Sequence, residues 1–333
     1  MNAVEKLPLL ALYAPTACGK TALCSELFGQ SSLFFAGRAE IISADSMAVY
    51  RGLDIGTAKP SAEERKNLVH HLIDICDISQ QFGAGEFVES ADKLAFEIAS
   101  RSKIPAIVGG TGFYLRNFLL GLPPTPPSNP LVRERLKERL KEEGSEALHA
   151  ELARFDAESA KKIHPNDSFR ICRALEVFEI SGKPRSAFSV SGAIRSKYDV
   201  CTVILTRERN ELYERIDFRV DEMFRRGLAD EVQELLFEGH NVCEPGMQAI
   251  GYREFAQKWQ NRQFSLSELD EIRDNIKRNS RKYAKKQFTY MKDIPGAEIF
   301  NAEDRDLVIK KISDFCDYAL NLLDVSGKRY DNL

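Results

Sequence analysis

Short apolar runs alternate with amphipathic stretches through the first third of the chain. Residues 7–13, 40–44 and 104–108 have the pattern of buried strands, and helical patterns lie between them near residues 21–28 and 86–99. Alternating strands and helices predict a parallel sheet covered by helices, so the expected fold class is α/β. Ligands bind such sheets at the carboxyl ends of the strands. Three segments follow strand ends and are expected to converge there: residues 14–21, 45–48 and 109–112.

The pattern changes at residues 121–130, where the sequence GLPPTPPSNP is rich in proline and marks a boundary. Helical patterns follow, which predicts a mainly α-helical insertion domain over residues 123–191. Residues 198–206 then predict a strand that returns to the sheet, and the rest of the chain is expected to be mainly helical. The predicted architecture is therefore a P-loop-type core formed by residues 1–122 and 192–333, with the helical insertion between its halves.

Composition and charge narrow the class of protein. The chain has 333 residues, 43% of them hydrophobic, which allows a large core, and a formal charge of −3 gives no global sign of nucleic-acid binding. The 7 cysteines form neither a CxxC pair nor a cluster with zinc spacing. No apolar stretch approaches ~20 residues and no secretory signal pattern opens the chain, so a cytoplasmic protein without a membrane anchor is expected. A monomer is the working expectation for the oligomeric state.

A phosphate-binding loop is the clearest candidate site. It consists of Ala14, Pro15, Thr16, Ala17, Cys18, Gly19, Lys20 and Thr21, and it fits GxxxxGK[ST] except at its first position, where glycine is usual. Backbone N–H groups of such a loop converge on phosphate oxygens, the lysine adds a cation, and the threonine hydroxyl can ligate Mg²⁺. Any diphosphate ester would fit, ATP included; a chance strand–turn–helix is the alternative. Cys18 stands beside Lys20 and a helix N-terminus, which predicts a reactive thiolate whose alkylation inactivates the protein.

Two further candidate sites each have more than one possible role. Asp45 ends the second apolar run, where its carboxylate is suited to ligating Mg²⁺, to acting as a general base, or to capping a helix. Arg215 and Arg219 are i, i+4 neighbours in a later helical stretch. They are equally suited to binding a diphosphate or to forming salt bridges along their helix.

Several motifs after the phosphate loop occur together in one order. They are IISADSMAVYRGLDIGTAKP (residues 41–60), HHLID (70–74), GGTGFYLR (109–116), RALEV (173–177) and AIGYREF (249–255). The set resembles the bacterial tRNA dimethylallyltransferase family, also called tRNA isopentenyltransferase, over nearly the whole chain. The resemblance implies transfer of a dimethylallyl group from dimethylallyl diphosphate to N6 of the adenosine 3′ to the anticodon of tRNA, with Mg²⁺ as cofactor.

The resemblance also implies roles for single residues. Asp45 matches the family's general base, Thr21 matches a hydroxyl that assists the leaving diphosphate, and the loop with Lys20 matches the diphosphate cradle. Positions that match tRNA-contacting segments are Asp45, Ser46, Met47, Ala48, Thr111, Phe169, Arg170 and Arg173. The sequence departs from the family pattern at Ala14, at Cys18, and at Ala48 and Phe169, which stand where glutamine is frequent.

A basic segment near the C-terminus supplies a predicted nucleic-acid surface. Over residues 273–292 only Asp274 is acidic, and Lys277, Arg281 and Lys285 share a stripe at i, i+4 spacing. Because the stripe lacks compensating acids, we expect it to contact tRNA phosphates; a solvated helix face is the alternative.

Three other functions share some of these features. A small-molecule kinase would explain the phosphate loop but not the basic stripe or the insertion. An enzyme that prenylates free adenine nucleotides would share the core without needing a large nucleic-acid surface. A nucleic-acid-binding NTPase module without prenyl transfer is the remaining alternative.

Overall fold

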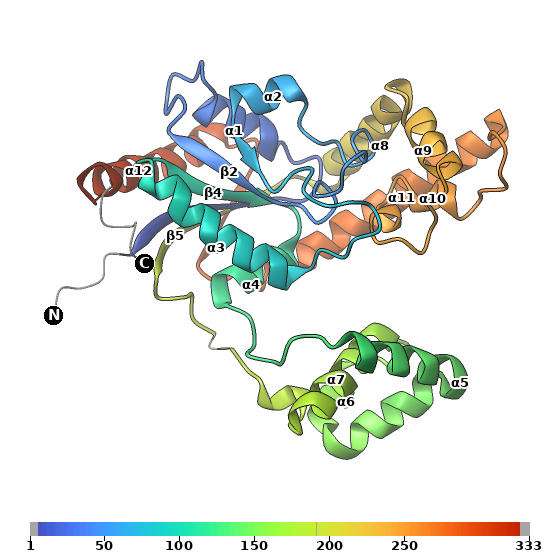
Figure 1. The fold of residues 1–333 in the computed structure, drawn as a ribbon. Helices are drawn as coiled ribbons and strands as arrows, with labels where there is room; N and C mark the ends of the chain where they lie inside the picture. The colour runs from blue at the N-terminus through green and yellow to red at the C-terminus, as the bar shows by residue number, and fades with distance from the viewer. Residues whose placement is uncertain (1–5, 191, 327–333) are drawn as a thin grey trace. The chain divides into compact units, whose positions relative to one another are not determined.

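The computed structural model describes residues 6–190 and 192–326, and within them a parallel sheet of six strands forms the centre of the larger unit (Figure 1). The strands are β1 (Leu7–Tyr13), β2 (Ala39–Ala44), β3 (His70–His71), β4 (Ile104–Gly109), β5 (Tyr198–Thr206) and β6 (Ala297–Asn301). Their order is β3-β2-β4-β1-β5-β6, so β1 lies between β4 and β5. Every residue of β1, β2 and β4 is buried, as expected for parallel strands covered on both faces.

Helices cover both faces of this sheet. α1 (Lys20–Phe28) connects β1 to β2 in one direction across the sheet, and α3 (Ala84–Ser100) connects β3 to β4 in the other. Because such crossovers are right-handed, α1 and α3 lie on opposite faces. α4 (Gly112–Leu120) packs on α3, where the rings of Tyr114 and Phe87 stack with centroids 4.6 Å apart. α12 (Arg305–Ser326) lies beside α1 and pairs Arg305 with Glu26. α2 (Ala62–Asn67) precedes β3.

A group of helices extends the unit beyond the sheet (Figure 1). It contains α8 (Arg209–Arg225), α9 (Leu228–Phe237), the 3₁₀ turn η2 (Gly246–Gln248), α10 (Arg253–Ala256) and α11 (Leu266–Met291). α8 and α10 meet through Phe224 and Phe255, whose rings stack with centroids 6.0 Å apart. α8 and α11 run alongside one another and pair their charged residues, as described below.

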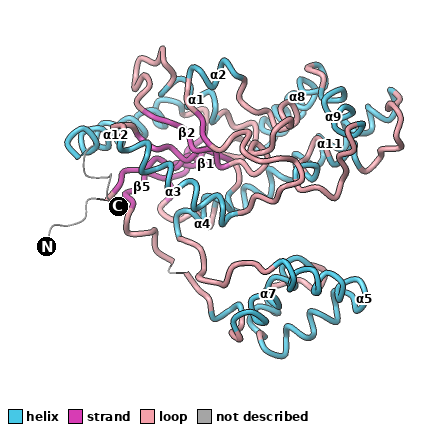
Figure 2. The backbone as a smooth tube through the Cα atoms, in the orientation of Figure 1, coloured by secondary structure: helices cyan, strands magenta, loops and turns pink. Residues whose placement is uncertain are grey.

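The second unit, Leu120–Gly192, has its own apolar core, and its regular elements are helical (Figure 2). They are α5 (Pro130–Phe155), α6 (Ala157–Lys162), α7 (Ser168–Ser181) and the 3₁₀ turn η1 (Arg185–Ala187). Gly144 departs from helical geometry inside α5, with φ 81° and ψ 165°, so α5 consists of two helices joined at a kink. The other unit ends at Leu119 and resumes at Ala193, so the expected insertion, residues 123–191, falls within the helical unit.

The predicted alternation of strands and helices matches the structure, and two short strands were missed. β3 has only two residues, and β6 is an edge strand whose side chains are half-buried or exposed, so neither has the apolar pattern of a buried strand. Among the helices of the described residues, none combines the length and the apolar content needed to cross a membrane.

Candidate active site

The phosphate loop lies where the sequence placed it, between the end of β1 and the first residue of α1. Gly19 precedes the helix with φ 95°, a left-handed conformation that glycine adopts without strain. Ala17 also has a positive φ, 65°, whereas Ala14 is not among the described residues with positive φ. Ala14 is fully buried and its N–H donates to the Gly109 carbonyl at 3.2 Å. Alanine is therefore accommodated at the position where glycine is usual.

Two cations from distant parts of the sequence meet at this loop. Lys20 begins α1 and Arg219 lies on α8, and both line the cavities around the loop. Burial, and then the nearby Arg219 guanidinium, lower the pKa of Lys20. Burial likewise lowers the pKa of Arg219, which Asp45 opposes. Two desolvated cations that repel each other form a site that an anion would stabilise, which favours the diphosphate-binding alternative for Arg219.

Asp45 follows β2 and faces the same space. Its Oδ1 accepts hydrogen bonds from the N–H groups of Met47 at 2.9 Å and Ala48 at 3.3 Å. No helix begins at this residue, so the helix-capping alternative is wrong, although the carboxylate does order a turn. Asp45, Lys20 and Arg219 all line a cavity of about 260 Å³. A carboxylate and two cations are thus brought together by β2, α1 and α8.

The turn after β4 and helix α11 complete the wall of this cavity. Thr111 Oγ1 accepts the Ser46 N–H at 3.0 Å, which ties this turn to the one after β2. Gln287 of α11 accepts the Thr16 N–H at 3.0 Å and donates to the Gly110 carbonyl at 2.8 Å. A Cβ at Gly110 would lie 2.5 Å from Gln287 Nε2, so this close approach needs glycine. The three segments that follow β1, β2 and β4 therefore converge, as predicted.

The side chains that α10 and α11 contribute to the cavity were not predicted from the sequence. They are Arg253, Ile276, Ser280, Tyr283 and Gln287. The last four recur every three or four residues, so they share one face of the helix. The prediction for this helix relied instead on its basic residues, which lie on a different face. Burial raises the pKa of Tyr283 to about 12, so its hydroxyl stays protonated near neutral pH.

A second, larger cavity of about 800 Å³ is also lined by Lys20 and Arg219. Thr21 and Ser25 of α1 and Phe218 of α8 line it as well, and Asp45 does not. The two cations therefore face both of these cavities, and of the two only the smaller is lined by Asp45; a third space of about 80 Å³ is lined by Lys20, Arg219 and Asp45 together with Thr21. This arrangement allows two reactants to reach the cations from different sides.

The structure changes the interpretation of the basic stripe. Lys277 pairs with Asp221 at 2.7 Å and Arg281 pairs with Asp217 at 2.5 Å, both on α8. The prediction that the stripe lacks compensating acids is therefore wrong, because those acids come from a neighbouring helix. Lys285 is exposed, on a face it shares with three other exposed cations of α11: Arg278, Lys282 and Lys286.

The other residues predicted to contact tRNA also divide into those that are buried or paired within the protein and those that are accessible. Ala48 is only 4% exposed, so its side chain cannot form part of a nucleic-acid surface. In the helical unit, Arg173 donates to Glu176 at 2.6 Å and to the Pro126 carbonyl at 2.9 Å, which anchors the proline-rich segment. Phe169 is 73% exposed, and Arg170 is exposed beside Asp167. Of these residues, Phe169 and Arg170 are the ones that remain accessible.

The predicted reactivity of Cys18 is wrong. The side chain is 1% exposed, and burial raises the pKa of its thiol to about 11 in spite of Lys20, Arg207 and Arg215 nearby. We expect iodoacetamide at pH 7.5 to modify the exposed Cys243 and leave Cys18 unmodified, because a buried thiol is a poor nucleophile. Peptide mass spectrometry after a time course checks this. Rapid labelling of Cys18 in the folded protein would contradict it.

A strand, a phosphate loop and a helix N-terminus, with a carboxylate and a second cation in the same cavity, define a phosphate-loop α/β protein whose cavity suits a phosphate ester. A family model described as IPP transferase matches residues 48–294. The chain is 44% identical to tRNA dimethylallyltransferase 1 of Trichlorobacter lovleyi over 292 residues, which cover 87% of this chain and 92% of the relative. It is 40% identical to tRNA dimethylallyltransferase of Geobacter sulfurreducens over 296 residues, 89% of this chain and 92% of that protein. The chain therefore belongs to the IPP transferase family.

Solved structures agree with this assignment. The tRNA isopentenylpyrophosphate transferase of Bacillus halodurans matches with a TM-score of 0.64 and 35% identity, covering 96% of this chain and 99% of that one. A eukaryotic dimethylallyltransferase, described as acting on tRNA, matches with a TM-score of 0.78 and 25% identity, covering 98% and 87%. The family and the fold class predicted from the sequence are thus confirmed.

Proposed function

We propose that the protein transfers a dimethylallyl group from dimethylallyl diphosphate to N6 of the adenosine 3′ to the anticodon in tRNA and releases diphosphate. The observation that carries this proposal is that Asp45, Lys20 and Arg219 line one cavity. An alkyl transfer from a diphosphate ester to an amine needs a proton acceptor and an anion-stabilising site within reach of each other. The names of the relatives, tRNA dimethylallyltransferase, supply the substrate class.

Asp45, Lys20 and Arg219 each have a role in the proposed reaction. The N6 nitrogen attacks C1 of the dimethylallyl group, the C1–O bond breaks, and its electron pair leaves with the diphosphate. Asp45 accepts the proton that N6 loses, a form of help typically worth ~10²–10⁴-fold in rate. Lys20, Arg219 and the loop N–H groups stabilise the charge that develops on the departing diphosphate. The apolar side chains in the same cavity, among them Met47, Ile216 and Met223, suit a hydrocarbon tail.

Mg²⁺ belongs to the proposal as a partner of the diphosphate. Thr21 is exposed in the first turn of α1 and lines the larger cavity beside Lys20, so its hydroxyl is the protein ligand proposed. Among the described residues no group of three or more His, Cys, Asp or Glu could hold a metal, so the other ligands would be diphosphate oxygens and water. When bound, the ion would neutralise charge on the leaving diphosphate.

Two exposed groups of residues are proposed to bind tRNA. One is the exposed cations of α11, Arg278, Lys282, Lys285 and Lys286; the other is Phe169 and Arg170 of the helical unit. The target adenosine must leave its stack to reach Asp45, at a cost of a few kcal/mol. We place the reaction in the cytoplasm, where tRNA and the diphosphate substrate meet.

A substrate comparison tests this function. The purified protein is incubated with Mg²⁺ and dimethylallyl diphosphate, and with unmodified tRNA, AMP or ADP as acceptor; ATP alone is a fourth arm. We expect one dimethylallyl group on the adenosine next to the anticodon, detected by mass spectrometry of digested tRNA. Prenylation of AMP or ADP without prenylation of tRNA would support a free-nucleotide enzyme instead. ATP turnover without prenyl transfer would support a kinase or NTPase.

A further inference from the structure

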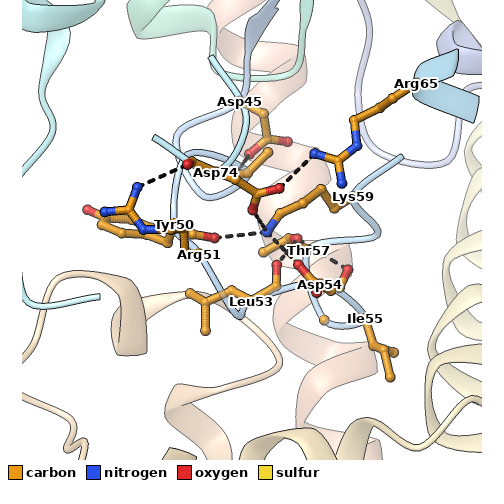
Figure 3. A network of polar contacts seen from close by, with 12 residues as sticks. Asp45, Tyr50, Arg51, Leu53, Asp54, Ile55, Thr57, Lys59, Arg65 and Asp74 are labelled. Carbon is orange, nitrogen blue, oxygen red and sulfur yellow. Dashed lines mark hydrogen bonds and ion pairs between the residues drawn. The ribbon is translucent and has the colours of Figure 1, made fainter. Parts of the chain in front are cut away.

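A buried lysine lies behind the segment that carries Asp45. The side chain of Lys59 is 2% exposed, and its Nζ donates to the Tyr50 carbonyl at 2.8 Å, to Asp54 at 2.6 Å and to Asp74 at 2.5 Å (Figure 3). Three acceptors satisfy the three N–H groups of an ammonium ion. A buried cation is costly unless it is paired and hydrogen-bonded in this way, and removing the lysine would take one partner from each of Asp54 and Asp74.

The backbone on both sides of this contact is strained. Ala58, Leu72 and Asp74 have φ values of 48°, 60° and 57°, in the left-handed region that residues with a side chain rarely adopt. This conformation is unfavourable for a residue with a side chain and persists only where its surroundings hold it. Lys59 follows Ala58 directly, and Asp74 is also bound by Arg65 at 2.7 Å. The ionic contacts thus hold a conformation that the chain would not adopt locally.

Two hydrogen bonds lead from Asp74, a partner of Lys59, to Asp45. The N–H of Asp74 donates to the Ala48 carbonyl at 3.2 Å, and the N–H of Ala48 donates to Asp45 Oδ1 at 3.3 Å. A second connection runs to the anion site, where the Thr57 carbonyl accepts a hydrogen bond from Arg219 at 3.5 Å. Figure 3 shows Asp45 and Thr57 at the two sides of the network around Lys59.

We propose that Lys59 is a positioning residue, which holds the segment from residue 45 to residue 57 so that Asp45 and Arg219 keep their places in the cavity. Its ammonium group is bonded to the Tyr50 carbonyl, Asp54 and Asp74, so it acts through Asp74 and the backbone. The expected effect on the reaction rate rests on the proposed prenyl transfer. The structural part of the proposal, that the order of this segment depends on one ion pair, is independent of the reaction. Misplacing a catalytic group by about 1 Å costs up to ~10²-fold in rate.

Lys59→Met tests the proposal, because methionine keeps the bulk and removes the charge. We expect kcat for tRNA prenylation to fall about 10- to 100-fold. KM for dimethylallyl diphosphate should change less than about threefold, because Lys20 and the phosphate loop lie outside the network and Arg219 meets it only through one hydrogen bond of 3.5 Å. Hydrogen exchange should accelerate in peptides from residues 45–57 and 72–76 but not in peptides from α1. Asp74→Asn is the milder second variant, for use if Lys59→Met does not fold, and it should shift both readouts in the same direction.

Lys103→Met is the matched control. Lys103 also pairs with a buried carboxylate, Glu40 at 3.0 Å, but at the opposite end of the sheet from Asp45. Equal losses of kcat in Lys59→Met and Lys103→Met would overturn the proposal, because they would mean general destabilisation. So would wild-type kcat and unchanged exchange over residues 45–57 in Lys59→Met and Asp74→Asn. If the wild-type protein does not prenylate tRNA, the proposed function fails, and the exchange data still decide whether Lys59 orders this segment.

Discussion

Replacing Asp45 with asparagine is expected to lower kcat for tRNA prenylation by ~10²–10⁴-fold, because the amide cannot accept the proton that N6 releases. The amide oxygen of the introduced side chain can still accept the N–H groups of Met47 and Ala48, so the turn that follows β2 should persist. Affinity for tRNA should therefore change little. Single-turnover kinetics with saturating dimethylallyl diphosphate measures the chemical step, and filter binding measures the affinity.

Asp270→Asn is a suitable control for this variant. Its side chain is 70% exposed in the first turns of α11, where it pairs with Arg273, and surface pairs of this kind contribute little. We expect wild-type kinetics from it. If Asp45→Asn lost tRNA affinity in proportion to its rate, Asp45 would be a structural or tRNA-binding residue and not the base.

Replacing Lys20 with methionine is expected to lower kcat/KM for dimethylallyl diphosphate by ~10²–10³-fold, since the charge that develops on the leaving group loses a preorganised cation. The same replacement is not expected to lower the stability of the folded protein. The pKa of Lys20 is lowered by burial and by Arg219, which means that the folded, ligand-free protein disfavours the charged form. Removing that charge should leave Tm unchanged or raise it, as measured by differential scanning fluorimetry without ligand.

The combination of lower activity with undiminished stability separates a functional residue from a structural one. Lys93→Met serves as the control, because Lys93 is a 78% exposed lysine of α3 far from the cavities. A Lys20→Met protein with wild-type kcat/KM would contradict the diphosphate site. A marked drop in Tm would show that Lys20 supports the fold, and the kinetic loss would then have another explanation.

Much of the fold could be predicted because its signals are local. The buried strands β1, β2 and β4 are continuous apolar runs, and the phosphate loop is one uninterrupted segment whose backbone geometry depends on its own residues. The convergence of three loops followed from the rule that parallel strands end at one edge. β6 could not be predicted in the same way, because an edge strand need not be apolar.

The contacts of the α11 side chains could not be predicted from their neighbours in the sequence. Lys277 and Arg281 have no acidic neighbour on their own stripe, yet Asp221 and Asp217 neutralise them from α8, a helix distant in the sequence. Gln287 gives no signal among the basic residues around it, yet it joins the phosphate loop to the turn after β4. The same limit applies to Cys18, whose sequence neighbours suggested a thiolate and whose burial prevents one.

The sequence by itself determined the order of strands and helices, the phosphate loop, the position of Asp45 at a strand end, and the family. These features depend on periodicity and on contiguous motifs, which are properties of neighbouring residues. The tertiary structure alone decided which cations line the cavities, which are neutralised by another helix, and that a buried lysine is hydrogen-bonded to the segment that follows Asp45. Those outcomes depend on which helix faces pack together and on how far burial removes water from charged groups. Neither property can be predicted from a single segment of the sequence, because both depend on residues that are distant in the chain.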